Sequence, residues 1–388
     1  MAISKDKQKA LNAIMGKINK KFGDNTISKL VDVTEELRVT YHKTPSYELN
    51  AMLGGGLGKG KIIELFGQPG CGKTSLALEE IANAQREDKE FMVAWLETEG
   101  SFDPDDCEMF GIDTDRFLYL EQSEELNAED AMDIIRSLVS SGEFDMVVVN
   151  SVAALCPKKE VEDDLEKQNI ALTARLLSKF LRITTAQISK NKCTLILINQ
   201  VRANLNSMYG GTVTSGGMAI PFYSTQRIEM KRERVMSGDP IDEEDGIKIR
   251  CKVVKNRLAK GNPFKVCHYY ALYGKGIDGT SELGTVLARE GILNKKGAWL
   301  RFEDESGEII KVPSDKGEIE ARWNGNAAFV NFLRENDSTK QYFEKLLDEK
   351  LATGKVGVSL SREEIEEIEK AEAQLADENK NLEKETVA

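Results

Sequence analysis

The sequence predicts an α/β fold in which a mostly parallel β-sheet is covered by helices on both faces. Between residues 61 and about 231, short apolar runs typical of buried parallel strands alternate with longer segments of helical periodicity. The first apolar run leads into a glycine-rich turn, and a helical segment follows that turn at once. This order is the one that a strand–loop–helix unit requires.

Residues 5–21 predict an N-terminal amphipathic helix. Leu11, Ile14, Met15 and Ile18 fall on one face of it, and lysines occupy the remaining positions. A helix of this kind must bury its apolar face either on its own domain or on a neighbouring subunit, and the sequence leaves both alternatives open.

The central part of the chain contains the strand and helix candidates in alternation. The strand candidates are 61–66, 91–96, 117–120, 145–149, 193–198 and 224–230, and the helix candidates are 73–86, 127–141 and 168–191. Two further β-like runs follow, 247–255 and 264–272. A change of composition near Gly274 then predicts a smaller C-terminal unit.

Composition and charge exclude several classes of protein. The apolar runs are far too short to span a bilayer, and the six cysteines are scattered, which favours reduced thiols and a cytoplasmic protein without a membrane partner. Two histidines cannot form a His-rich metal site. The net charge is −12, but residues 361–388 carry ten acids and four bases. This acidic tail is compatible with a basic binding surface elsewhere, because the local field steers a partner.

The glycine-rich turn reads G-x-x-x-x-G-K-T from Gly67 to Thr74. In this pattern backbone N–H groups surround a polyphosphate, the lysine reaches the β- and γ-phosphates, and the Thr74 hydroxyl binds Mg²⁺. The sequence therefore predicts a site for a nucleoside triphosphate and Mg²⁺ formed by Gly67, Gln68, Pro69, Gly70, Cys71, Gly72, Lys73, Thr74 and Ser75.

Polar residues end three of the predicted strands, at the sheet edge where open α/β sheets bind ligands. Glu97 and Glu99 follow one strand, and we expect Glu99, nearer the strand end, to face the nucleotide and act as a general base. Asn150 ends another strand where a metal-supporting Asp is usual, and an amide brings no charge. Gln200 ends a third strand beside the glycine-rich segment 206–217, an arrangement that suits a nucleotide-dependent loop.

Several motifs together resemble the bacterial RecA family of DNA strand-exchange proteins. They are the turn at Gly67–Thr74, Glu99 to Pro104, Val147 to Leu155, Ile198 to Arg202, Gly216-Gly217, Phe222-Tyr223 and Lys252 to Asn256. The resemblance implies a RecA-like P-loop core, ATP and Mg²⁺ between subunits, and a homo-oligomeric helical filament on single-stranded DNA that pairs with homologous double-stranded DNA. The implied domains are an oligomerisation arm at 1–35, a core at 36–274, a small α+β domain at 275–352 and a mobile acidic tail at 353–388.

The resemblance also implies roles for individual residues. Glu99 matches the family's catalytic glutamate and Gln200 its nucleotide-sensing glutamine. Lys255 and Arg257 match two lysines that reach the γ-phosphate across the subunit interface, as arginine fingers do. Asp103 matches an acid near the adenine edge.

Two loops, 163–170 and 202–217, match the family's DNA-binding loops. Their implied contacts are phosphate contacts from Ser178, Arg182, Gly216 and Gly217, apolar wedges from Ile170 and Leu205, and supporting cations at Arg175 and Arg202. The chain departs from the family at Asn150, and at Asp106, where bacterial members carry a tyrosine stacked on adenine.

These observations predict a DNA-dependent ATPase that catalyses homologous pairing and strand exchange in recombination, DNA repair and the SOS response to DNA damage. Asn150 leaves a second possibility open, a nucleotide-binding mediator with weak ATPase activity. A ring helicase on the same fold is a third alternative.

Overall fold

The structure is a computed structural model that describes residues 4–23, 26–123, 125–162, 171–203, 212–236, 241–258 and 266–353. The predicted loop 163–170 with Ile170, the middle of the second loop with Leu205, and nearly all of the acidic tail lie outside the described residues. The chain divides into two compact units, Met1–Thr40 and Tyr41–Ala388.

The first unit contains the predicted N-terminal helix. Helix α1 spans Lys5–Phe22, and a short 3₁₀ turn at Leu30–Asp32 and helix α2, Thr34–Leu37, follow it. No residue of α1 is buried, and the side chain of Ile14 is 56% exposed. The described residues of this unit therefore leave the apolar face of α1 uncovered.

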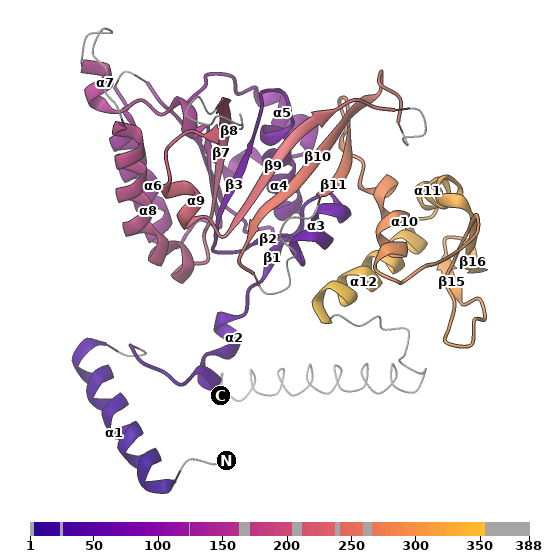
Figure 1. Cartoon of the computed structure of the whole chain (residues 1–388), viewed down its shortest axis with the longest axis horizontal. Helices are drawn as coiled ribbons and strands as arrows, with labels where there is room; N and C mark the ends of the chain where they lie inside the picture. Colours follow the sequence, from indigo (N-terminus) through magenta and orange to yellow (C-terminus); the bar gives the residue numbers. More distant parts are fainter. Residues whose placement is uncertain are drawn as a thin grey trace. The chain divides into compact units, whose positions relative to one another are not determined.

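The second unit is built on a ten-stranded sheet (Figure 1). Six strands in the spatial order β9-β3-β7-β6-β4-β5 are parallel, and β10, β11 and β12 extend the β9 side in antiparallel fashion. These strands and β8, which pairs with β7, have the bounds β3 Ile62–Gly67, β4 Val93–Glu97, β5 Phe117–Glu121, β6 Met146–Asn150, β7 Thr194–Ala203, β8 Thr212–Thr214, β9 Gln226–Glu233, β10 Gly246–Asn256, β11 Val266–Leu272 and β12 Gly276–Ile277. The predicted α/β class with a mostly parallel sheet is confirmed.

Successive residues of a strand point to opposite sides of the sheet. The strands carry apolar side chains on both sides, and helices cover both faces. Ile63 packs with Leu76 in one apolar core, and its neighbour Ile62 packs with Ile135 and Leu181 in another. The first core includes α3 Tyr47–Leu53, α4 Lys73–Glu87 and α5 Pro104–Phe110, and the second includes α6 Ala128–Ser141, α8 Leu172–Lys190 and α9 Ala219–Tyr223. Helix α7, Lys158–Glu162, and the small pair β1 Tyr41–His42 and β2 Leu57–Gly58 complete this part.

A third apolar core lies in the C-terminal part. Its aromatic centre brings Trp323 and Phe329 together with ring centroids 4.7 Å apart, and Phe343 packs edge-on against both. The elements here are α10 Gly279–Arg289, β13 Asn294–Lys296, β14 Trp299–Arg301, β15 Lys311–Ser314, β16 Gly317–Glu320, β17 Arg322–Asn324, α11 Gly325–Glu335 and α12 Asp337–Thr353. The large sheet ends with β12, just past the composition change near Gly274.

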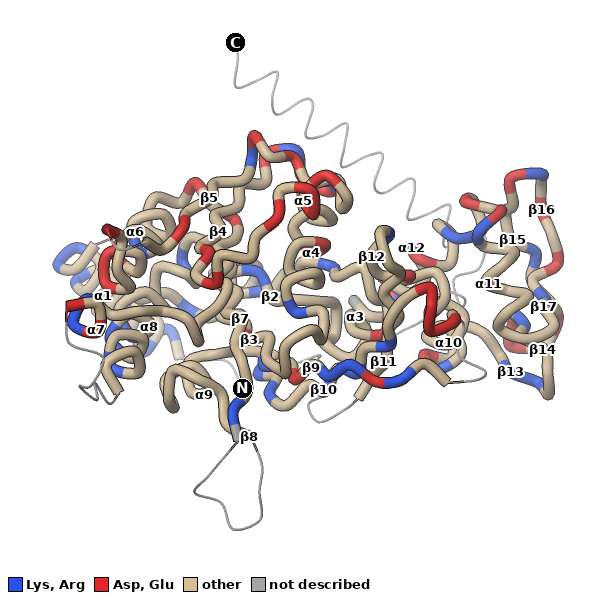
Figure 2. Tube along the Cα trace, turned by 90° about the horizontal axis from the view of Figure 1, so that it is seen from above, with Lys and Arg blue, Asp and Glu red and all other residues tan. Residues whose placement is uncertain are grey.

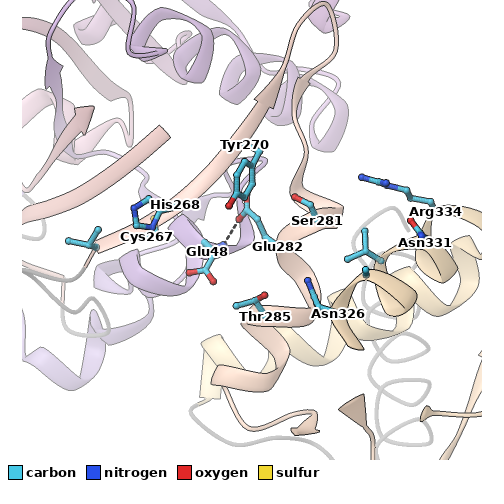
Figure 3. Close-up of a pocket in the computed structure, with 13 residues that line it drawn as sticks. Glu48, Cys267, His268, Tyr270, Ser281, Glu282, Thr285, Asn326, Asn331 and Arg334 are labelled. Atoms are coloured by element: carbon cyan, nitrogen blue, oxygen red, sulfur yellow. Dashed lines mark hydrogen bonds between the residues drawn. The ribbon is translucent and has the colours of Figure 1, made fainter. Parts of the chain in front are cut away.

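A cavity of about 510 Å³ lies between β11 and the helices α3, α10 and α11 (Figure 3). Three of its ionisable lining residues contact neighbouring residues: Glu48 contacts Arg289, His268 contacts Glu233, and Arg334 contacts Asp278. None of the residues that line it belongs to the predicted nucleotide or DNA sites.

Candidate functional site

The carboxyl ends of the parallel strands bring the predicted nucleotide residues to one edge of the sheet. The strand register places Gly67 of β3 opposite Gln200 of β7, and Glu97 of β4 opposite Asn150 of β6. Strands β3, β7, β6 and β4 are successive neighbours in the sheet. Residues that are far apart in the sequence therefore meet where such sheets bind ligands.

The glycine-rich turn joins β3 to α4 in the way its motif requires. Gly70 and Gly72 have φ values of +70° and +77°, which glycine adopts without a steric cost. The side chain of Lys73 is 8% exposed, and its Nζ donates to the carbonyl oxygen of Gln68 at 2.9 Å. A buried ammonium next to the N-terminus of a 15-residue helix fits an anionic phosphate group.

Asn150 lies between Thr74 and Glu97. Its Oδ1 is 3.5 Å from the hydroxyl oxygen of Thr74, and its Nδ2 donates to Glu97 Oε2 at 2.8 Å. A hydroxyl oxygen and an amide oxygen are hard donors of the kind that Mg²⁺ accepts. Thr74 and Asn150 are therefore the residues that would hold Mg²⁺, directly or through water, and the ion would neutralise phosphate charge when bound.

Glu97 is fully buried behind this pair. Its carboxylate accepts hydrogen bonds from Trp95 Nε1 at 3.1 Å, from Asn150 Nδ2 at 2.8 Å and from the backbone N–H of Glu99 at 2.8 Å. Sequence reasoning noted this acid but favoured Glu99. The two acids have different surroundings, because Glu97 is buried and hydrogen-bonded, whereas Glu99 is exposed.

Glu99 contacts two polar side chains at the strand ends. Its Oε1 accepts a 2.8 Å hydrogen bond from Gln200 Nε2 and a second one from the Ser151 hydroxyl. Ser151 is itself fixed by Thr98, whose hydroxyl accepts from the Ser151 N–H and donates to the Ser151 carbonyl, both at 2.8 Å. Ser151 was not predicted, although its place directly after Asn150 in the sequence was a usable signal.

Asn199 links β7 to Ser215, which lies near the C-terminal end of the second predicted DNA loop. Its Nδ2 donates to Glu64 Oε1 and to the Ser215 carbonyl, both at 2.9 Å, and its Oδ1 accepts from the Gln200 N–H at 2.9 Å. Glu64 also pairs with Arg227 of β9. Neither Asn199 nor Glu64 was predicted as a functional residue, and only the register of β3, β7 and β9 brings them together.

Three predicted DNA contacts lie on one exposed face of α8. Arg175, Ser178 and Arg182 are all exposed, and their spacing of three and four residues aligns them along the helix. Arg202, another predicted cation, is exposed on β7 opposite Val213 of β8.

The two predicted glycines form a turn that packs closely on this helix. Gly216 and Gly217 have φ values of +84° and +71°. A Cβ on Gly216 would lie 2.8 Å from a methyl carbon of Leu177, and one on Gly217 would lie 2.9 Å from Cβ of Ala174. The structure thus brings the glycine turn beside the α8 face that carries Arg175 and Ser178.

Lys255 and Arg257 lie at the opposite edge of the sheet from Lys73. Asn256 of β10 pairs with Gln226 of β9, which pairs in turn with Ile63 near the amino end of β3. The Nζ of Lys255 donates to the carbonyl oxygens of Pro221 at 2.6 Å and Phe222 at 2.9 Å. Burial, reinforced by the neighbouring Arg257 and Arg227, lowers the pKa of Lys255 to about 8.

The remaining nucleotide candidate, Asp103, caps the N-terminus of α5. Its carboxylate accepts from the Asp105 N–H at 3.0 Å. Burial and repulsion from Asp103 and Asp105 raise the pKa of the neighbouring Asp106. This corner carries negative charge and offers no aromatic surface at position 106.

A row of cations that sequence reasoning did not single out follows β9 and β10 (Figure 2). Lys231 lies directly opposite Arg250 in the pairing of these strands, and Lys252 follows on the same face, whereas Arg232, opposite Ile249, points to the other face. Lys231 and Arg232 are exposed. The recurrence of Lys and Arg in 227–234 and 248–257 was the available signal.

A phosphate-binding turn at the carboxyl edge of a mostly parallel sheet, with polar residues on the adjoining strand ends, defines a P-loop nucleotide-binding protein. Residues 9–278 match the family model described as RecA N-terminal domain. The chain is 34% identical over 359 residues to the protein RecA of Paenarthrobacter aurescens (strain TC1), covering 92% of this chain and 96% of that one. It is 39% identical over 301 residues to the protein RecA of Mannheimia haemolytica, covering 77% and 79% of the two chains.

The protein RecA of Nostoc punctiforme is 36% identical over 380 residues, covering 95% of this chain and 98% of its own. The chain belongs to the RecA family, and its function is that of a recombinase in recombination and DNA repair, with binding of ATP and DNA. RecA proteins are in general DNA-dependent ATPases that use ATP with Mg²⁺ and form filaments. Among the residues described, no helix combines the length and apolarity needed to cross a membrane.

Proposed function

We propose that this chain uses ATP binding and hydrolysis to control a helical filament on single-stranded DNA, and that the filament carries out homologous pairing and strand exchange with double-stranded DNA. One observation carries the proposal. Lys73 and the pair Lys255 and Arg257 lie at opposite edges of one sheet. A triphosphate that is contacted by both sets of cations requires two copies of the chain.

In this proposal Glu99 orients and deprotonates the water that attacks the γ-phosphate. Its carboxylate is exposed at the strand end and can accept a proton, and Ser151 and Gln200 fix its position. Lys73 neutralises phosphate charge from within the same chain, and Lys255 and Arg257 do so from the neighbouring chain. Asn150 and Thr74 would hold Mg²⁺, directly or through water.

The same contacts give a route from the nucleotide to DNA. Gln200 contacts Glu99 through its side chain, and its backbone N–H is bonded to Asn199, which binds the Ser215 carbonyl. Ser215 directly precedes the two glycines that pack on α8. A nucleotide-dependent shift of Gln200 would therefore move one end of the 202–217 loop and change its grip on DNA phosphates.

The N-terminal arm, 1–35, is proposed to dock on a second copy of the chain. The side chains of Ile14, Leu30 and Val31 are 56%, 72% and 77% exposed. Such an apolar surface marks an interaction site in a protein that is otherwise highly charged. The proposed receptor lies beside β5, the edge strand of the sheet, where Leu118 and Ile134 of α6 are 44% and 37% exposed and line the same apolar hollow.

Asn150 supports a second candidate function, a nucleotide-binding recombination mediator that hydrolyses ATP weakly. The end of β6 that faces Thr74 carries the neutral amide of Asn150. An aspartate there would add a negative charge that balances Mg²⁺, and the amide does not. The two candidates differ in turnover and agree in nucleotide and DNA binding.

The deciding experiment measures ATP hydrolysis with and without single-stranded DNA and images the same mixtures by electron microscopy. The proposal expects DNA-stimulated turnover and ATP-dependent filaments. The Glu99→Gln variant should keep the filaments and lose turnover by about 10²–10⁴-fold, because it keeps the shape of the site and removes the base. Filaments with no measurable turnover in the wild type would favour the mediator, and absence of both would reject the proposal.

A further inference from the structure

The amide of Asn150 is attached to two chemically different partners. On one side its Nδ2 lies 2.8 Å from Glu97 Oε2, and on the other its Oδ1 lies 3.5 Å from the hydroxyl oxygen of Thr74. The backbone register of β4 and β6 places Glu97 directly opposite Asn150, so the contact follows from the sheet itself.

The partners of Glu97 determine which end of the amide faces which neighbour. Besides the Asn150 amide, the indole N–H of Trp95 and the backbone N–H of Glu99 point to this carboxylate, and both can only donate. A carboxylate that accepts from its neighbours in this way requires the NH₂ end of Asn150. The carbonyl end of the amide must then face Thr74.

We propose that Glu97 and Asn150 act together as one metal-supporting unit. Asn150 presents the neutral oxygen toward Thr74, and Glu97 is a positioning residue that orients this oxygen and supplies the negative charge that the end of β6 lacks. Glu97 is fully buried, and a charge in a dry site acts more strongly on its surroundings than one in water. Outer carboxylates commonly orient and tune metal ligands in this manner. The proposal rests on the proposed binding of ATP with Mg²⁺.

Asn150→Asp restores the residue that is usual at this position and places a second carboxylate in contact with Glu97, where the wild type has an amide N–H donor. Two adjacent carboxylates repel one another, so this variant should lose stability. Glu97→Gln should relieve that loss, because it brings an amide donor back to the contact.

The test compares four proteins, the wild type, Glu97→Gln, Asn150→Asp and the double variant Glu97→Gln/Asn150→Asp. Binding of a fluorescent ATP analogue is titrated with Mg²⁺ at pH 7, and a parallel series contains EDTA. Thermal unfolding of the nucleotide-free proteins is followed in the same buffer. Glu143→Gln is the matched control, because Glu143 is an exposed glutamate just before the amino end of β6, at the opposite end of that strand from Asn150.

We expect Glu97→Gln to raise the Mg²⁺ concentration for half-maximal nucleotide binding by roughly 10–100-fold, with little change in EDTA. Asn150→Asp should lower the unfolding temperature of the nucleotide-free protein. The double variant should recover both the unfolding temperature and the Mg²⁺ dependence, because it contains one carboxylate and one amide in exchanged places. Equal unfolding temperatures of Asn150→Asp and the double variant would overturn the coupling.

The unfolding series separates failure of this inference from failure of the proposed function. If the wild type binds no nucleotide, the proposed function is wrong, but a loss of stability in Asn150→Asp that Glu97→Gln relieves would still demonstrate the pair. If nucleotide binds normally and neither measurement shows coupling, the unit does not exist.

Discussion

The side-chain amide of Gln200 donates a 2.8 Å hydrogen bond to the Oε1 atom of Glu99. Gln200 lies on β7 and Glu99 follows the carboxyl end of β4, with β6 between these two strands in the sheet. The bond therefore spans the strand end that carries Asn150. Gln200 also lies just before the second predicted DNA loop, 202–217. One residue therefore contacts the proposed catalytic base and adjoins the proposed DNA-binding loop.

Gln200→Ala is expected to uncouple the two activities. The variant should bind ATP with less than about threefold loss, because Lys73 and Thr74 are untouched, and should lose about tenfold or more of the stimulation of hydrolysis by single-stranded DNA. Steady-state kinetics with and without an oligonucleotide separate KM from kcat. Unchanged stimulation would show that the Glu99–Gln200 bond does not transmit the effect of DNA.

Filament assembly is expected to weaken as the pH rises through about 8. The pKa of Lys255 is lowered to about 8, mainly by burial, so its charge is present below that pH and lost above it. A triphosphate from a neighbouring copy needs the charged form, and assembly at pH 9 must then take up a proton. This costs about tenfold in assembly affinity relative to pH 7. Lys255→Arg stays charged and should show a flat profile by light scattering over pH 7–9.

Gly217→Ala is expected to weaken DNA binding by about tenfold or more. The new methyl group would meet Ala174 of α8 at 2.9 Å, in a backbone conformation with φ of +71° that alanine adopts at a cost of about 1–2 kcal/mol. Gly291→Ala is the matched control, since its φ is +74° but a Cβ there meets no atom within 4 Å. Fluorescence anisotropy with a labelled oligonucleotide measures both, and equal affinities would remove the turn from the DNA site.

Glu80→Met is expected to stabilise the protein, and more so at high pH. Glu80 is fully buried on α4, and neither carboxylate oxygen has a hydrogen-bond partner. Burial, with Glu87 adding to it, raises its pKa to about 8. The folded state therefore keeps a proton that the unfolded state releases, and the stability of the wild type falls as pH rises from about 4.5 to about 8.

Urea unfolding at pH 5 and pH 8 checks this expectation. The difference in the free energy of unfolding between Glu80→Met and the wild type should widen by at least about 1 kcal/mol at the higher pH. Glu108→Met, at an exposed glutamate of α5, should change little and by the same amount at both values. A gap that is independent of pH would mean that Glu80 is not held in its protonated form.

The large elements could be predicted from the sequence because their signals are local. The apolar run that became β6 and the amphipathic pattern of α6 each identify one element with bounds close to the observed ones. Helices α5 and α9, of seven and five residues, were missed because so few residues carry no readable 3.6-residue period. Lys73 and Thr74 were found because their motif is contiguous.

The rest of the site depends on strand register, which the sequence does not display. Glu97 and Glu99 both follow the predicted strand 91–96, and only the contacts with Trp95 and Asn150 show which one is buried. Asn199 is one amide among several in the sequence. Its contacts with Glu64 and Ser215 exist because β3 and β7 are neighbours and because a chain segment returns to β7.

Glu64 sits on the strand that leads into the phosphate turn and is engaged from both sides, by Asn199 of β7 and by Arg227 of β9. Losing the carboxylate alone would leave the guanidinium of Arg227 largely buried without its counter-charge, and an uncompensated buried charge is costly. Evolution should therefore replace these two partners jointly. Across the natural diversity of the family, substitutions at positions 64 and 227 are expected to occur as correlated pairs, while the surrounding apolar strand residues drift independently.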